Sequence, residues 1–105
     1  MTKFQIVWRR NVQAPWPADR TKIAENLDEM FDAIERYMDA GMIKENGFFV
    51  DAHSGSFIFE GTSADVLKIT SFFSPVIAFD IKEIIPYEKG KNVMLESLHE
   101  KTLAR

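Results

Sequence analysis

Apolar residues occupy every second position near the start of the chain, at Phe4, Ile6 and Trp8. A spacing of two predicts a strand with one buried face, because successive side chains of a strand point to opposite sides. Between about residues 19 and 40 the spacing changes to three and four, which predicts a long amphipathic helix. Gly41 follows, at the place where a left-handed C-terminal cap would end that helix. The apolar side of the helix holds Ile23, Leu27, Met30, Phe31, Ile34 and Met38.

Two short β-prone runs, Phe48 to His53 and Ser56 to Gly61, come next. Ser54-Gly55 lies between them and predicts a tight hairpin turn, since glycine supplies the positive φ that such turns require. Asn46-Gly47 is a second turn signal, so the earlier strand could begin before it or after it.

A second helix is predicted after Thr62 or Ser63, either of which can cap it, and Ser74-Pro75 should end it. Val76 to Ile85 is the last and most apolar predicted strand, and Pro86 ends it. Lys89-Gly90 is then expected to turn the chain into a final helix from about residue 91 to 104. The apolar positions of the second helix are Val66, Leu67, Ile69, Phe72 and Phe73.

The order strand, helix, strand, strand, helix, strand, helix predicts an α+β fold. We expect a ferredoxin-like βαββαβ sandwich with a four-stranded antiparallel sheet, helices on one face and an extra C-terminal helix. The 105 residues fit one domain, residues 1–105.

The other face of the predicted sheet mixes aliphatic and charged groups. A sheet face in water is normally mostly polar, so the mixture indicates a face half covered by a partner and half lining a cavity. The simplest partner is a second copy of the chain. Alternation places Gln5, Val7, Arg9, Ile58, Glu60, Val76, Ala78, Asp80, Lys82 and Ile84 on this face.

Charge and composition argue against several classes of binding partner. A net charge of -3 and a pI near 5.3 lack the basic surface of most nucleic-acid-binding domains, which argues against an RNA-recognition domain of the same topology. We find no apolar run long enough to span a bilayer and no signal-peptide pattern, so we expect no membrane contact and a cytoplasmic protein. The chain has no cysteine, and two separated histidines cannot supply a metal site, so neither a metal nor another cofactor is expected.

The run from Gly55 to Leu67 (GSFIFEGTSADVL), with the run from Phe73 to Pro86 (FSPVIAFDIKEIIP), resembles the dimeric α/β-barrel superfamily. That superfamily includes muconolactone isomerase, antibiotic-biosynthesis monooxygenases and small uncharacterised families. The resemblance implies a homodimer in which the sheets of two subunits pair into a barrel around a small organic ligand. A ligand-sensing domain of the ACT type is a third topological possibility, although the loop after the first strand lacks a glycine.

Three charged residues, Arg9, Glu60 and Asp80, are predicted to share the barrel face. A carboxylate near a guanidinium could hold a polar substrate or move a proton, or the groups could form a structural ion pair. His53 lies two residues from Asp51, so the pair could form a base with its orienting carboxylate, although a surface histidine at a hairpin is the commoner case.

Aromatic residues are the remaining candidates. Trp8, Trp16 and Tyr37 could line a pocket, although the alternation makes Trp8 a core residue and Tyr37 could lie at the helix edge. Trp16 lies between two prolines in a predicted loop, where it could cap a cavity mouth.

These observations leave two function classes. The first is a homodimeric module that binds a small organic ligand through Arg9, His53, Glu60, Asp80 and Trp16. The second is a cofactor-independent isomerase or monooxygenase-like enzyme, in which Arg9, His53, Glu60 and Asp80 position a substrate and move protons. We favour binding, because no catalytic constellation stands out.

Overall fold

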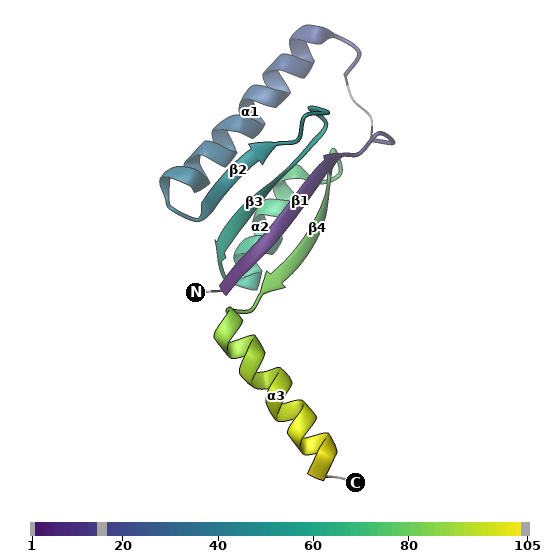
Figure 1. The fold of residues 1–105 in the computed structure, drawn as a ribbon. Helices are drawn as coiled ribbons and strands as arrows, with labels where there is room; N and C mark the ends of the chain where they lie inside the picture. The colour runs from purple at the N-terminus through teal and green to yellow at the C-terminus, as the bar shows by residue number, and fades with distance from the viewer. Residues whose placement is uncertain (1, 15–16, 104–105) are drawn as a thin grey trace.

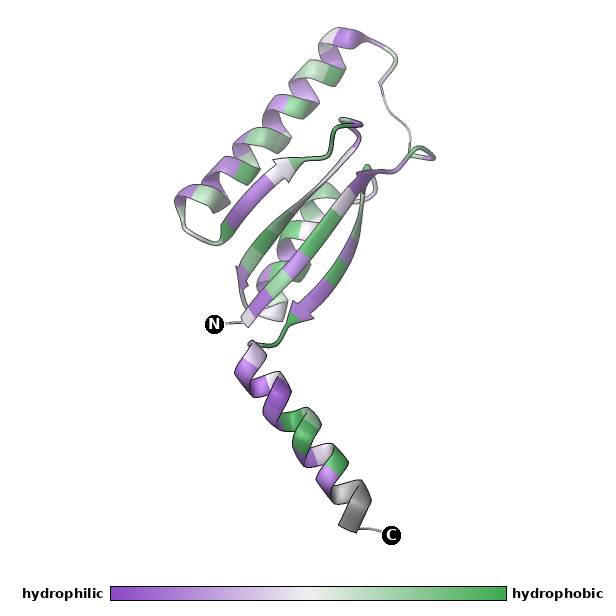
Figure 2. Cartoon of the chain, in the orientation of Figure 1, coloured by the Kyte–Doolittle hydropathy of each residue, from purple (hydrophilic) through white to green (hydrophobic). Residues whose placement is uncertain are grey.

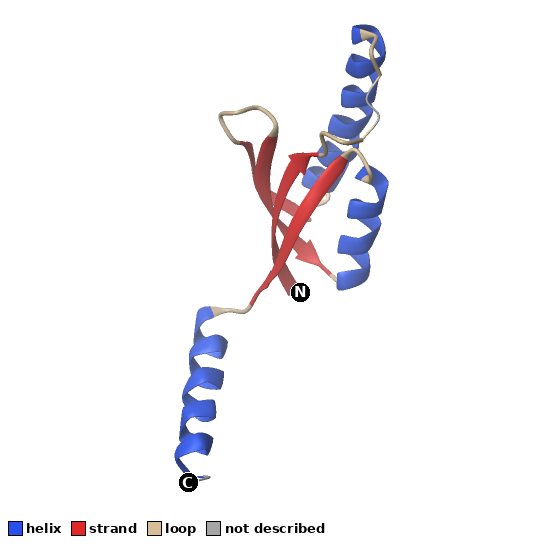
Figure 3. Ribbon diagram, turned by 90° about the vertical axis from the view of Figure 1, so that its right-hand side faces the viewer, coloured by secondary structure: helices blue, strands red, loops and turns tan. Residues whose placement is uncertain are grey.

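The computed structural model describes residues 2–14 and 17–103. It contains β1 (Thr2–Arg10), α1 (Arg20–Asp39), β2 (Ile43–Phe48), β3 (Ser54–Gly61), α2 (Ser63–Phe73), β4 (Ile77–Ile84) and α3 (Tyr87–Leu103). The strands form one antiparallel sheet in the order β2-β3-β1-β4. Helices α1 and α2 lie on the same side of it, and α3 extends away from its end (Figure 1 and Figure 3). The predicted ferredoxin-like α+β fold with a C-terminal helix is therefore confirmed.

The register of the sheet places the predicted helix-facing side chains on one side and the predicted outward-facing side chains on the other. Ile6 on β1 pairs with Phe57 on β3 and with Ile81 on β4, and these side chains face α1 and α2. Val7, one residue later, pairs with Ser56 and Asp80 on the opposite side, which we call the open face. Figure 2 shows hydrophobic and hydrophilic bands along β1.

The core lies between the sheet and the two helices. Phe59, Ile6 and Ile69 are its largest fully buried side chains, and each stabilises the fold by about 1.5–3 kcal/mol through removal of apolar surface from water. The other buried apolar residues are Phe4, Ala33, Ile43, Phe57, Val66 and Phe73.

Helix caps set where α1 and α2 begin. The Asp19 side chain accepts a hydrogen bond of 2.8 Å from the Thr21 backbone N–H and caps α1. Thr62 and Asp65 form a reciprocal capping box at α2, with N–O distances of 3.1 and 2.9 Å. Gly41 has a φ of 76° directly after α1, as its position predicted.

The hairpin between β2 and β3 differs from the prediction. The turn spans residues 49–53 rather than Ser54-Gly55, and Gly55 lies inside β3. Asp51 explains the difference, because its carboxylate accepts hydrogen bonds from the His53 backbone N–H (2.9 Å) and from the Ser54 hydroxyl (2.9 Å) and so closes a local turn. Asn46-Gly47 produces an irregularity within β2 instead of a turn.

The start of α3 also differs from the prediction. The helix begins at Tyr87, and Gly90 lies in its first turn rather than before it. The Pro86 carbonyl accepts a hydrogen bond of 2.9 Å from the Gly90 N–H, so Pro86 starts the helix instead of a Lys89-Gly90 turn. Across the described ranges, every helix is too short or too polar to cross a membrane.

Candidate functional site

Helix α1 covers the sheet incompletely. It contacts β2, at the edge of the sheet, and Ala33 is its one buried residue. Phe31 and Met38, on the apolar side of the helix, remain 43% and 44% exposed. The packing therefore leaves an apolar gap between α1 and the strands further inside the sheet.

That gap is a cleft of about 620 Å³, which we call the α1 cleft. Its floor comes from the helix-facing side chains of β1, β3 and β4, one wall from α1, and the ends from α2 and the β2–β3 hairpin. Apolar groups dominate it. The lining residues are Trp8, Arg10, Ile23, Leu27, Met30, Phe31, Ile34, Glu35, Met38, Asn46, Phe48, Ala52, His53, Phe57, Phe73, Ile77 and Phe79.

Three rings connect the elements around the α1 cleft. Trp8 and Phe48 meet edge to face, with ring centroids 5.6 Å apart and an interplanar angle of 86°. Phe31 of α1 also meets Phe48 edge to face, with ring centroids 6.1 Å apart and an interplanar angle of 82°. Such edge-to-face pairs add about 0.5–1.5 kcal/mol beyond the burial of their area. This row ties α1 to β1 and β2 and defines the shape of the cleft.

Four polar residues line the cleft, and all four are exposed, so they lie where it meets solvent. They are Arg10, Glu35, Asn46 and His53. The Asn46 side-chain amide lies 3.6 Å from the Met38 sulfur, a weak contact. An apolar interior with a few polar groups at its opening is the usual arrangement of a small-molecule site.

Of the charged or titratable site residues predicted from the sequence, all of them within the described ranges, His53 is the one that lines the α1 cleft. The predicted base with an orienting carboxylate is not formed, because the Asp51 carboxylate binds the His53 backbone N–H and the Ser54 hydroxyl rather than the imidazole. The His53 backbone N–H and the Ser54 hydroxyl lower the pKa of Asp51 below its ordinary value of 3.8. The hydrogen bonds of Asp51 therefore hold the turn in place.

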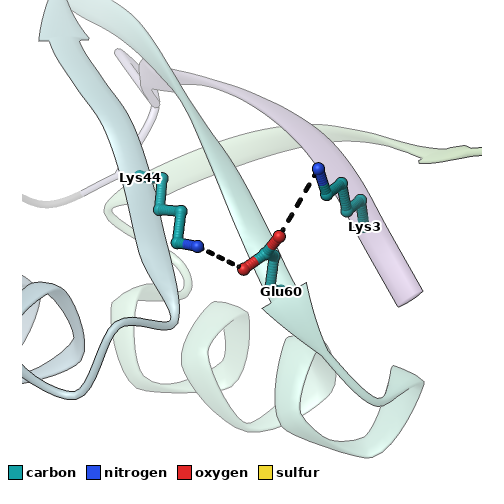
Figure 4. A network of polar contacts seen from close by, with 3 residues as sticks. All are labelled: Lys3, Lys44 and Glu60. Atoms are coloured by element: carbon teal, nitrogen blue, oxygen red, sulfur yellow. Dashed lines mark ion pairs between the residues drawn. The ribbon is translucent and has the colours of Figure 1, made fainter. Parts of the chain in front are cut away.

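Glu60 lies on the open face between two lysines. Its carboxylate is 2.7 Å from the Lys44 ammonium on β2 and 3.5 Å from the Lys3 ammonium on β1 (Figure 4). The hydrogen bond from Lys44, followed by the charges of Lys44 and Lys3, lowers the pKa of Glu60 below its ordinary value of 4.5, against the opposing effect of burial. Glu60 therefore forms ion pairs with a lysine on each of the two neighbouring strands.

We expect an NMR titration of the Glu60 carboxyl to have a midpoint below 4.5. Lys44→Ala should raise that midpoint more than Lys3→Ala, because Lys44 lies closer. With a lower pKa in the folded state, the ion pairs favour folding above pH 4.5 and lose this effect as the pH falls through the folded pKa. Equal shifts in the two variants would contradict the geometry.

The structure does not bring Arg9, Glu60 and Asp80 together. Glu60 pairs with Lys3, six residues from Arg9 along β1, which corresponds to about 20 Å. Asp80 pairs with Val7 and is a diagonal neighbour of Arg9, yet within residues 2–14 and 17–103 no ion pair joins the two. All three lie on the open face, on the other side of the sheet from the α1 cleft.

The aromatic residues predicted to line one pocket lie in different parts of the structure. Trp8 lines the cleft, whereas the Tyr37 ring packs on Phe59, with centroids 6.1 Å apart, and belongs to the edge of the core. Trp16 lies outside the described residues. The described part of the chain holds no cluster of three or more histidine, aspartate or glutamate side chains placed to bind a metal ion.

Sequence reasoning missed the α1 cleft. The signal was present in the width of the apolar side of α1, whose six apolar residues exceed what the edge strand β2 can cover. Comparison of the chain with protein families, with curated proteins and with solved structures found no match.

Proposed function

We propose that this protein binds a small, mostly apolar organic molecule in the α1 cleft. The observation that carries the proposal is the cleft itself, whose volume of about 620 Å³ falls within the range of about 300–1,000 Å³ usual for small-molecule sites. Its walls are aliphatic and aromatic side chains, so the favourable free energy of binding would come mainly from burial of the ligand's apolar surface.

This location differs from the predicted one between two paired sheets. On the open face, charged groups such as Arg9, Asp80 and Lys82 stand between the apolar positions, so a small apolar ligand would have charged neighbours there. The α1 cleft needs only one chain to form. Binding is also favoured over an isomerase or monooxygenase activity, because His53 is the only one of the predicted proton-transfer groups that lines the cleft.

The polar residues at the opening favour a ligand with one polar or anionic end. Arg10 and His53 offer donors there, and Glu35 and Asn46 offer acceptors. A molecule with an apolar body and one such group could bury the body between α1 and the sheet and leave the polar end in water.

The test uses 1-anilinonaphthalene-8-sulfonate, an apolar aromatic probe with one anionic group. We expect the wild-type chain to bind it and Leu27→Trp to weaken binding by about tenfold or more, because the larger side chain fills the cleft. Leu27 is only partly buried, so the fold should tolerate the change.

Glu25→Trp is the matched control, because Glu25 lies on the opposite side of α1 and is exposed. It should bind the probe as the wild type does, with probe fluorescence as the readout and circular dichroism as the check on folding. Equal binding by wild type and Leu27→Trp would place the probe elsewhere and contradict the proposal.

A further inference from the structure

Helix α3 projects from the end of the sheet instead of packing on it. In Figure 3 it lies beyond the sheet and toward the side of the open face, opposite α1 and α2. The radius of gyration is 18.2 Å, against about 13 Å for a compact chain of this length. One side of α3 carries Tyr87, Met94, Leu95 and Leu98, which are 78%, 69%, 56% and 61% exposed and which we call the α3 stripe. Figure 2 shows the hydrophobic patch in the middle of the helix.

The connection before α3 accounts for its direction. Only residues 85 and 86 separate β4 from α3, and proline at 86 restricts Ile85 to extended conformations. The chain therefore continues past the end of β4 rather than reversing. Helix α3 is carried beyond the end of its own sheet and does not fold back onto the open face.

The surface area shows how much remains uncovered. The chain exposes 8012 Å², whereas a compact monomer of 12.1 kDa exposes about 6,000 Å². The excess of about 2,000 Å² per chain corresponds to about 4,000 Å² for two chains. Permanent dimers bury about 2,000–5,000 Å² in total, so a second copy could cover the excess.

The open face is the surface of matching size. Its central strands have eight or nine residues, or about 26–30 Å, and α3 has 17 residues, or about 25 Å. Val7, Ile58 and Ala78 lie along this face as half-buried side chains, and Ile84 at its end is 37% exposed. They provide apolar positions on which the α3 stripe could lie.

We propose that α3 is a helical arm that lies across the open face of a second copy of this chain, and that the exchange is reciprocal. Each sheet is then covered by its own α1 and α2 on one side and by the partner's α3 on the other. A twofold axis near the β4–α3 connection brings each arm to the other subunit, as the self-complementary interface of a symmetric dimer requires.

The α1 cleft and the proposed docking surface of the arm lie on opposite sides of the sheet. Helix-facing side chains of β1, β3 and β4 form the floor of the cleft, whereas α3 projects toward the side of the open face (Figure 3). The cleft and the arm therefore serve different partners, and the dimer does not depend on the proposed ligand.

Disulfide trapping tests the proposal cleanly, because the chain has no cysteine of its own. Val7→Cys and Leu95→Cys chains of different mass are produced together and oxidised mildly. We expect a disulfide between the two kinds of chain, seen by mass spectrometry, because the arm brings position 95 over position 7 of the partner. Ile58→Cys replaces Val7→Cys if that variant fails to fold.

Glu96→Cys is the matched control, because Glu96 lies on the side of α3 opposite the stripe. It should form at least about tenfold less disulfide with Val7→Cys than Leu95→Cys does. Three results would overturn the proposal. Val7→Cys chains could link preferentially to each other, as directly paired sheets would allow, or Leu95→Cys could link instead to Leu27→Cys in the cleft. Light scattering could also give a mass of 12.1 kDa for the wild-type chain, the mass of a monomer.

Discussion

Replacing Phe59 with alanine is expected to lower the free energy of unfolding by about 3–5 kcal/mol. Phe59 has no solvent exposure, pairs with Phe4 and Ile43 on the neighbouring strands, and packs against the Tyr37 ring at 6.1 Å. Four elements therefore meet at this side chain. The loss includes the transfer energy of the ring and the cost of the cavity left behind, and it is a large part of the roughly 5–15 kcal/mol that stabilises a typical domain.

Urea unfolding followed by circular dichroism measures this loss. Phe49→Ala is the control, because Phe49 lies in the hairpin turn and is 46% exposed. We expect it to cost about 1 kcal/mol or less. Similar midpoints for the two variants would mean that the core does not centre on Phe59.

Replacing Gly55 with alanine is expected to cost about 1–3 kcal/mol, the second large effect. A Cβ atom at this position would lie 2.6 Å from Cζ2 and 2.8 Å from Cε2 of Trp8, and it would also collide with the Gly47 carbonyl oxygen. Either the indole or the β2–β3 pair must move. Because Trp8 lines the α1 cleft, the variant should also weaken binding of the anilinonaphthalene probe.

Gly47→Ala is the matched control, because a Cβ atom there would meet nothing within 4 Å. Its effect should stay within about 0.5 kcal/mol in the same urea experiment. A Gly55→Ala variant as stable as Gly47→Ala would contradict the close approach of Trp8 to β3.

The sheet and its two faces could be predicted because strand alternation leaves little freedom. One-residue slips would move every side chain of β1, β3 or β4 to the wrong face, so the apolar positions fix the register. The caps of the helices could also be predicted. Thr62 is a residue type favoured at a helix N-cap and Gly41 one favoured in the left-handed position after a helix, and the structure has both in these roles.

The hairpin and the start of α3 could not be predicted from residue types alone. Gly55 is compatible with a turn and with a close approach inside a strand, and the position of the Trp8 ring, a tertiary contact, decides between them. Gly90 likewise costs a helix only about 1 kcal/mol, which the other residues of α3 can offset. Such small local preferences yield to the surrounding structure.

The sequence placed the candidate residues mostly on the open face and did not predict the α1 cleft. The cleft consists of apolar residues that any core would contain. Whether α1 closes fully on the sheet depends on the packing of Phe31, Phe48 and Trp8, and no sequence spacing reports that packing.

Native mass spectrometry of the purified chain tests the central claim, binding in the α1 cleft, most directly. The wild type and Glu25→Trp are each incubated with the anilinonaphthalene probe and should hold one molecule per chain. Leu27→Trp, with the cleft filled, should appear without it. Equal occupancy in all three proteins, or no probe on any of them, would contradict the assignment of the cleft as a ligand site.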